Sequence, residues 1–319
     1  MDALSDVLRV IRLSGGVFLE AQFTTPWCVS GKVTSNDCRP FLEAPRHVIA
    51  YHFVAAGCMQ LRPDGGDAIE VRAGEIVLLP HNSVHTFGSE LDTTPVPVRE
   101  VMQVSKKGEL ARIAHGGGGS GDTTQLLCGF LGCDTPFSPL LSALPPVLKL
   151  NVRSTSSGAW IESSFRFAAS QIAAGHLGST TVIAKLSELL FVEAVSQFVA
   201  SLPAERRGWL AGLRDPQIAR ALSILHARPT ETWTAEALAL EVGMSRSSFA
   251  ERFSSVMGQP PMQYLAVWRM HMAAQSLREG HRSVAQVGAS IGYESEAAFS
   301  RAFKRQFGAS PANWRKASG

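Results

Sequence analysis

The chain has 319 residues, of which 45% are hydrophobic and 18% charged, a composition typical of folded globular protein and long enough for two domains. It contains no run of about 18 apolar residues, which argues against a membrane span, and its first residues, "MDALSDVLRVIRLSGG", lack the basic and apolar regions of a signal peptide. Its 5 cysteines show no paired CxxC spacing, which argues against a disulfide framework and favours a reducing cytoplasm.

The net charge of +3 is unevenly distributed along the chain. Residues 201–319 hold 15 Lys and Arg against 9 Asp and Glu, whereas the first 200 residues carry a small excess of acid. A basic C-terminal part predicts that nucleic acid binds at that end of the chain.

Residues from about 17 to 150 read as short strands separated by turns. Segments such as "HVIAYHFVAAG" and "GEIVLLP" are rich in β-branched and aromatic residues, and Asp64-Gly65-Gly66, Gly74 and Pro80 interrupt them. Regular short strands of this kind indicate a β-sandwich or a small barrel.

From about residue 159 the apolar residues recur at helical spacing. In "TVIAKLSELLFVEAVSQFVASL" they lie close to one stripe, which predicts either a core helix or the seam of a dimer. Pro203 and the following "AERRGW" mark a linker, so we predict one domain over 1–205 and a second over 206–319.

The second domain contains the same helical pattern twice. In the later copy, over about 283–307, Ser283 and Ser295 are suited to cap two helices, Gly292 to form the turn, and Phe299 and Phe303 to face inward with Phe307. The earlier copy, over about 234–257, has Thr234, Gly243 and Ser245 in the same roles. The offset between the copies is 49 before the turn and 50 after it, so the second turn has one extra residue.

A helix, a short glycine turn and a second helix form the helix-turn-helix motif, whose second helix enters the major groove. One such unit is weak evidence, because helical hairpins with phenylalanine cores are common. Two units at constant spacing, joined by the amphipathic "PMQYLAVWRMHMAAQSL" in a basic region, predict a DNA-binding domain instead of a plain helical bundle.

These two segments, from "WTAEALALEVGMSRSSFAERF" to "ESEAAFSRAFKRQFGASPANWR", resemble the AraC/XylS transcriptional regulators of bacteria. The first domain resembles the cupin-type sensor domain of one subgroup, through "YHFVAAG", "AGEIVLLPHNSVH" and "LLCGFLGCD". The resemblance implies an α+β chain: a cupin-like β-barrel with following helices for sensing and dimerisation, then an all-α domain with two helix-turn-helix units.

The resemblance also implies which residues meet DNA. On the two recognition helices they are Arg246, Ser247, Ala250, Glu251, Glu296, Ala297, Ser300, Arg301 and Lys304. Small or acidic residues occupy the reading positions of the first helix, so the second, with Arg301, is expected to contribute more to specificity. The implied partners are double-stranded promoter DNA, RNA polymerase if the protein is an activator, an unknown effector and a second copy of the chain, with no membrane.

Cupin barrels often hold a metal through three histidines and a glutamate. Here His52, His81 and His85 fall in the matching regions, but the close HxH pair is absent. We therefore expect no cofactor and no enzyme, with a metal or effector at these histidines as the weaker hypothesis. A metal-dependent cupin enzyme with an appended nucleic-acid module is the alternative function from another class.

The cysteines raise a second hypothesis for the signal. Some cupin-type members of the family sense oxidants through thiols, and Cys128 matches a position where such a cysteine occurs. The residues considered are Cys28, Cys38, Cys128 and Cys133. Lys32 and Arg39 lie near Cys28 and Cys38 in sequence, so we expect these two thiols to react faster than Cys128. We expect the cysteines to be buried and inert and the signal to be a small organic effector. Redox sensing is the alternative.

Overall fold

The computed structural model describes residues 4–5, 13–38, 45, 47–103, 111–117, 121–133, 139–152, 163–164, 167, 179–203 and 206–316. The chain forms two compact units, one mainly from residues 12–134 and 144–198 and the other mainly from residues 199–319. We call these the sensor unit and the helical unit. Within the described residues, no helix combines the length and hydropathy that a bilayer crossing requires.

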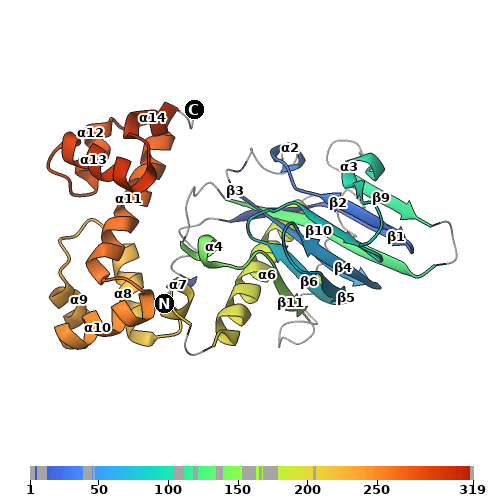
Figure 1. The fold of residues 1–319 in the computed structure, drawn as a ribbon, viewed down its shortest axis with the longest axis horizontal. Coiled ribbons are helices and arrows are strands. Elements are labelled where there is room, and N and C mark those ends of the chain that lie inside the picture. Colours follow the sequence, from blue (N-terminus) through green and yellow to red (C-terminus); the bar gives the residue numbers. More distant parts are fainter. Residues whose placement is uncertain are drawn as a thin grey trace. The chain divides into compact units, whose positions relative to one another are not determined.

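The sensor unit is built from two antiparallel-rich sheets (Figure 1). The larger has the strand order β11-β6-β3-β10-β1-β9 and the smaller β5-β4-β7-β2-β8. The strands are β1 Ser14–Thr24, β2 Cys28–Gly31, β3 His47–Ala56, β4 Cys58–Pro63, β5 Ile69–Arg72, β6 Glu75–Leu79, β7 His85–Gly88, β8 Val96–Pro97, β9 Ala111–Gly116, β10 Thr123–Cys133 and β11 Leu148–Asn151. This double-layered, jelly-roll-like arrangement confirms the β-sandwich that the strand pattern predicts and the cupin-like fold that the resemblance implies, although it is not a closed barrel.

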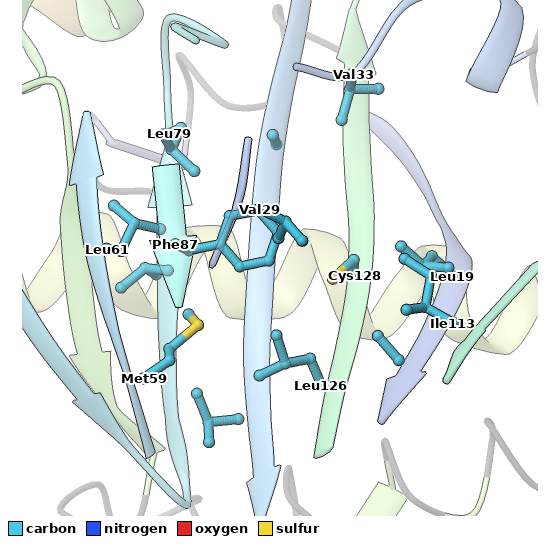
Figure 2. Close-up of a cluster of buried hydrophobic side chains, with 14 of the residues drawn as sticks. Leu19, Val29, Val33, Met59, Leu61, Leu79, Phe87, Ile113, Leu126 and Cys128 are labelled. Atoms are coloured by element: carbon cyan, nitrogen blue, oxygen red, sulfur yellow. The ribbon is translucent and has the colours of Figure 1, made fainter. Parts of the chain in front are cut away.

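The predicted turn residues separate strands in the structure. Gly65 and Gly74 have φ values of +69° and +86°, which disfavour other residues, and they lie in the connections β4–β5 and β5–β6. Alternate side chains of both sheets then meet in one apolar core (Figure 2), so Leu61 and Phe87 of the smaller sheet pack in the same cluster as Phe130 and Leu126 of the larger.

Short helices flank the sheets, and one long helix follows them. They are α2 Ser35–Cys38, α3 Val98–Val101 and α6 Ser179–Ser201, whereas α4 Pro139–Ala143 belongs to the helical unit. Leu186, Leu190 and Val195 of α6 are buried, and the Ser187 hydroxyl lies 2.9 Å from that of Tyr51 on β3. The apolar stripe therefore packs in the core of the unit over much of its length, as the core-helix interpretation predicts.

The helical unit contains α7 Trp209–Gly212, α8 Pro216–Ala227, α9 Ala235–Glu241, α10 Arg246–Met257, α11 Pro261–Glu279, α12 Val284–Ser290, α13 Glu296–Phe307 and α14 Pro311–Lys316. The α11 helix joins the α9–α10 pair to the α12–α13 pair (Figure 1), as its amphipathic sequence predicts. Its residues Met270, Ala273 and Leu277 pack with Phe299 and Phe303 of α13. Each buried phenylalanine contributes about 1.5–3 kcal/mol relative to exposure, which fixes α13 against α11.

Candidate DNA interface and sensor cavity

In the first helix-turn-helix unit, a capping side chain begins each of the two helices. The Thr234 hydroxyl accepts the backbone N–H of Ala237 to begin α9, and the Ser245 hydroxyl accepts that of Ser248 to begin α10. Between them Gly243 adopts a φ of +73°, which lets the chain turn within a few residues.

The second unit has the same kinds of capping residues and a turn glycine. Ser283 and Gln286 form a reciprocal capping box at α12, and the Ser295 hydroxyl accepts the N–H of Ala298 at α13. Gly292 has a φ of +91°, and Gly308, at +74°, ends α13. The caps and turn glycines expected from the sequence are therefore confirmed in both copies.

The extra residue of the second turn is Glu294. The N–H of Met244 donates to the carbonyl of Ala239 at 2.8 Å, and the equivalent bond from Tyr293 to Gly288 measures 3.0 Å, so the two turns match up to this point. Ser245 follows Met244 directly, whereas the exposed Glu294 separates Tyr293 from Ser295. The insertion therefore lies at the entry to the second recognition helix.

The residues predicted to meet DNA lie on the faces of α10 and α13 that turn away from the phenylalanine cores. Ala250 and Ser300 are half-buried and the others are exposed: Arg246, Ser247, Glu251, Glu296, Ala297, Arg301 and Lys304. Within the described residues, Arg246, Arg301 and Lys304 have no carboxylate partner. Arg252, by contrast, pairs with Asp215 at 2.6 Å. Three cationic side chains are thus available to an anionic partner, two of them on α13.

The sensor unit brings together three residues that sequence reasoning had treated under separate hypotheses. Cys128 on β10 lies opposite His52 on β3 in the sheet register, and its Sγ is 3.0 Å from His52 Nδ1. The other ring nitrogen of His52 is 2.8 Å from His85 Nε2, which comes from β7 in the opposite sheet. His52, His85 and Cys128 therefore form one buried hydrogen-bonded chain across the interior of the unit.

The donor and the acceptor of each hydrogen bond in this series can be deduced by starting from His85. His85 Nδ1 lies 2.9 Å from the carbonyl oxygen of Ser83, which can only accept, so this nitrogen donates. With both rings neutral, His85 Nε2 accepts from His52 Nε2–H, and His52 Nδ1 accepts from the Cys128 thiol. Burial lowers the pKa of both histidines, with the charge of His85 adding to the effect on His52, and raises the pKa of Cys128 to about 12.

A cavity of about 30 Å³ adjoins this chain. Its walls include Leu19, Val33, Phe87 and Met102 as well as the three chain members, and Figure 2 shows Cys128 and Leu19 in the apolar cluster. Lys32, Asp37 and Arg99 line it as well, and the Arg99 guanidinium lies 3.4 Å from the Asp37 carboxylate. The sequence pattern did not single out Asp37 or Arg99, because they come from α2 and α3, short helices without a motif of their own.

The three histidines considered for a metal do not converge. His81 Nε2 bonds to the carbonyl of Leu144 at 3.0 Å, while His52 and His85 bond to each other. Within the described residues, no group of three or more His, Cys, Asp or Glu has the arrangement of a metal site. Because a stable zinc or iron site needs convergent ligands, these residues do not fit the histidine-based metal centre of cupins.

The cysteines are mostly buried, as expected, but the expected thiolate at Cys38 is contradicted. Cys28, Cys38 and Cys133 are buried as well as Cys128, whereas Cys58, which was not singled out, is exposed. Burial, together with the neighbouring Asp37, raises the pKa of Cys38 to about 12. The expectation of a favoured thiolate at Cys38 is therefore wrong, because desolvation and a nearby acid outweigh a basic neighbour in the sequence.

The two units together define a class: a double-sheet sensor fold joined to paired helix-turn-helix motifs that bind DNA. A cupin family model matches residues 2–200, and a helix-turn-helix domain model matches residues 238–317. The chain belongs to the AraC-like transcription regulators, and to the cupin family through its first 200 residues.

Relatives match over nearly the whole chain. An AraC-like transcription regulator of Streptomyces lividans is 32% identical over 318 residues, covering 99% of this chain and 98% of its own. The HTH-type transcriptional regulator AlkR of Acinetobacter baylyi is 29% identical, with 100% of both chains covered. The RCS-specific HTH-type transcriptional activator RclR of Escherichia coli is 26% identical, over 99% of this chain and 98% of its own.

Proposed function

We propose that this regulator reads promoter DNA mainly through α13 and adjusts its DNA affinity to a signal received beside Cys128. The observation that carries the first part is the contrast between the two exposed faces. The α13 face holds two cations, Arg301 and Lys304, with no carboxylate partner within the described residues and one acid, Glu296, whereas the α10 face offers Arg246 and the acid Glu251. Arginine pairs with guanine edges in the major groove, and lysine neutralises phosphates.

The test is a binding assay with the full-length chain and the DNA upstream of its own and neighbouring genes. Fluorescence anisotropy over a salt series is expected to show affinity that falls steeply with salt, because cationic side chains release counterions from DNA. It is also expected to show a preference for one upstream region over random DNA. A folded protein without salt-sensitive binding to any of these fragments would disprove the proposal.

For the signal, the favoured hypothesis is a small molecule that enters the cavity at His52, His85 and Cys128. Its volume of about 30 Å³ accommodates roughly two water molecules, since a site for one water needs about 10–15 Å³. A larger organic effector must therefore displace side chains of the wall, and Val98, Arg99 and Met102, on and beside the short α3, are candidates because none of them is fully buried. Such a displacement would link effector binding to a movement of α3.

The second candidate is oxidant sensing at Cys128, and the 3.0 Å contact with His52 favours it. A peroxide or hypochlorite is small enough for the cavity and would convert the thiol to a sulfenic acid, while the oxidant is reduced to water or chloride. His52 Nδ1 is the base nearest to the thiol proton, and burial opposes this proton transfer because it lowers the pKa of His52 and raises that of Cys128. The relative RclR is described as RCS-specific, and we propose a comparable oxidant response for this chain as the second candidate.

The remaining partners are proposals of the same kind. We propose that the regulator contacts RNA polymerase if it is an activator, and that it acts in the bacterial cytoplasm, where promoter DNA and the polymerase are found. For a homodimer, Val182 and Leu189 of α6 are exposed and two helical turns apart, which gives a narrow apolar strip for a second copy. We propose no enzymatic activity, because the histidines that a metal-dependent cupin enzyme would use do not converge.

A further inference from the structure

The two helix-turn-helix units are joined through α11 (Figure 1). Within the described residues, the main helix contacts of α12, α13 and α14 are with one another and with α11. Tyr264, in the first half of α11, packs edge-on against Phe253 of α10, with ring centroids 6.0 Å apart. Ala273 and Leu277, in the second half, pack with Phe299 of α13. The position of α13 relative to α10 therefore depends on α11 and on side chains that reach both units.

Arg269 is such a side chain, at the middle of α11. It is half-buried, and its Nε and Nη2 donate to the backbone carbonyls of Pro229 and Glu231, each at 2.6 Å. Both acceptors lie in the loop between α8 and α9, which leads into the first helix-turn-helix unit. Hydrogen bonds from a charged donor are the stronger kind, and the planar guanidinium presents its donors in a fixed geometry. The first unit therefore holds this guanidinium in one orientation.

The loop that accepts these bonds is itself fixed to α9. The guanidinium of Arg228 lies 3.2 Å from the carboxylate of Glu241, the last residue of α9. The indole N–H of Trp233 donates to the carbonyl of Arg228 at 2.9 Å, and its backbone N–H donates to that of Glu231 at 2.9 Å. Arg269 is thus connected through this loop to the first helix of the first unit.

The remaining nitrogen of Arg269 lies beside the second unit. A Cβ added to Gly292, the turn glycine between α12 and α13, would be 3.9 Å from Arg269 Nη1, which is ordinary contact distance. The next residue, Tyr293, packs on Phe299 with ring centroids 5.7 Å apart. Burial raises the pKa of Tyr293, and the positive charges of Arg305 and Arg269 oppose that rise. One side chain therefore lies between the loop before α9 and the turn before α13.

The surroundings of Arg269 differ from those of an arginine that contacts DNA. Arg301 is exposed, whereas Arg269 is half-buried and two of its three nitrogens are bonded to backbone carbonyls. These contacts favour a role in positioning over a phosphate contact.

We propose that Arg269 is the positioning residue that fixes α13 relative to α10, and that it thereby sets the spacing between the two DNA segments that the regulator accepts. The second clause rests on the proposed function, because it needs both recognition helices on one DNA molecule. Paired recognition helices meet segments about 10–10.5 base pairs apart, so one added base pair moves a segment by about 3.4 Å and rotates it by about 35°. A fixed pair of helices rejects that change, and a loosened pair tolerates it.

The first experiment compares the two helices in the absence of DNA. Nitroxide labels are attached to Ser255→Cys on α10 and Gln306→Cys on α13, both exposed positions, in the full-length protein with Cys58→Ser, so that the remaining native cysteines are buried. Double electron–electron resonance is expected to give one narrow distance distribution, and a broader or shifted one after Arg269→Met. Methionine keeps an apolar stem but cannot donate to the two carbonyls. Identical distributions would overturn the proposal.

The second experiment uses the DNA that the unsubstituted protein selects from a randomised pool, and the same DNA with one base pair inserted between its two segments. The insertion is expected to weaken binding of the unsubstituted protein about tenfold and binding of Arg269→Met less than about threefold. An equal insertion penalty for the two proteins would contradict the spacing role. An equal loss of affinity for both DNAs in Arg269→Met would identify a phosphate contact instead.

The matched control is Arg278→Met, which removes another half-buried arginine from α11. Arg278 lies 4.5 Å over the ring of Trp314, so this contact stays within the second half of the helical unit. The control is expected to keep both the narrow distribution and the insertion penalty. If Arg269→Met does not fold by circular dichroism, Arg269→Lys gives the same comparison, because its compact amine lacks the planar fork.

The two measurements fail separately. A broadened distribution without DNA binding by the unsubstituted protein would contradict the proposed function and keep the positioning role of Arg269. An unchanged distribution with intact DNA binding would remove the role of Arg269 and leave the regulator as proposed.

Discussion

Gly288 on α12 lies directly against the ring of Phe299 on α13. A Cβ added to Gly288 would come within 3.0 Å of the Phe299 side chain, closer than ordinary van der Waals contact. At the equivalent position of the first unit the chain has Ala239, which is buried. A side chain at position 288 would therefore press on Phe299, so the contact between α12 and α13 favours glycine here.

We therefore expect Gly288→Leu to destabilise the protein by about 1–3 kcal/mol, because the added atoms overpack the contact with Phe299. Ala289→Leu, on an exposed position of the same helix, is the matched control and is expected to change stability by less than about 0.5 kcal/mol. Urea unfolding followed by circular dichroism measures both. Equal stabilities of the two variants would show that α12 and α13 pack less closely than the structure indicates.

Arg301 and Lys304 are expected to differ in their effect on DNA recognition. If Arg301 contacts a base edge, Arg301→Ala costs about 1–3 kcal/mol on the preferred site and relaxes the preference at one or two base pairs. Lys304→Ala, as a phosphate contact, lowers affinity evenly and reduces the salt dependence. Selection from a randomised DNA pool, with anisotropy on single sites, measures both effects.

The control for these two variants is Arg72→Ala, which removes an exposed positive charge from the sensor unit. It is expected to leave DNA affinity unchanged. If Arg301→Ala lowers the affinity for specific and random DNA equally, Arg301 contacts a phosphate and not a base.

The helical unit was predictable because its signals are local. Each helix start is marked by a capping residue such as Thr234 or Ser295, and each turn by a glycine with positive φ, within a few residues of the helix that it defines. The unequal offsets of the two copies even indicated the added residue, which the structure identifies as Glu294.

The sensor cavity could not be predicted in the same way. His52 and Cys128 are 76 residues apart and meet only because β3 and β10 pair in one register, and His85 reaches them from the other sheet. No local pattern fixes a register between distant strands or the packing of two sheets. For the same reason Arg39, adjacent in sequence, was a poor guide to the environment of the buried Cys38.

Asp215 is expected to matter more for stability than its ion pair suggests. Its carboxylate accepts the N–H groups of Gln217 and Ile218 at the start of α8 and pairs with Arg252 of α10. Asp215→Ala removes a helix cap and should cost about 1–2 kcal/mol. Arg252→Ala removes only a partly exposed ion pair, and its cost should stay below about 1 kcal/mol.

Asp215→Asn separates the two contributions, because the amide oxygen still caps α8 while the charge on Arg252 is no longer balanced. Its stability in urea is expected to lie close to that of Arg252→Ala. A loss for Asp215→Asn as large as for Asp215→Ala would assign the effect to the ion pair instead of the cap.

The last prediction concerns the order in which the cysteines react. In the native protein at pH 8, Cys58 is expected to react first with the disulfide reagent DTNB, because it is the exposed one of the five. Cys128 and Cys38 are expected to react slowly, since burial blocks access and their pKa values of about 12 leave almost no thiolate at this pH. Raising the pH toward 10 increases the thiolate fraction of both groups but does not open the core, so the order should persist until the protein unfolds.

Cys58→Ser should remove the fast phase, and guanidinium should release the remaining thiols together. A fast phase that survives in Cys58→Ser and disappears in Cys128→Ser would instead identify a Cys128 thiol that His52 activates, and would favour the oxidant-sensing hypothesis over the small-molecule effector.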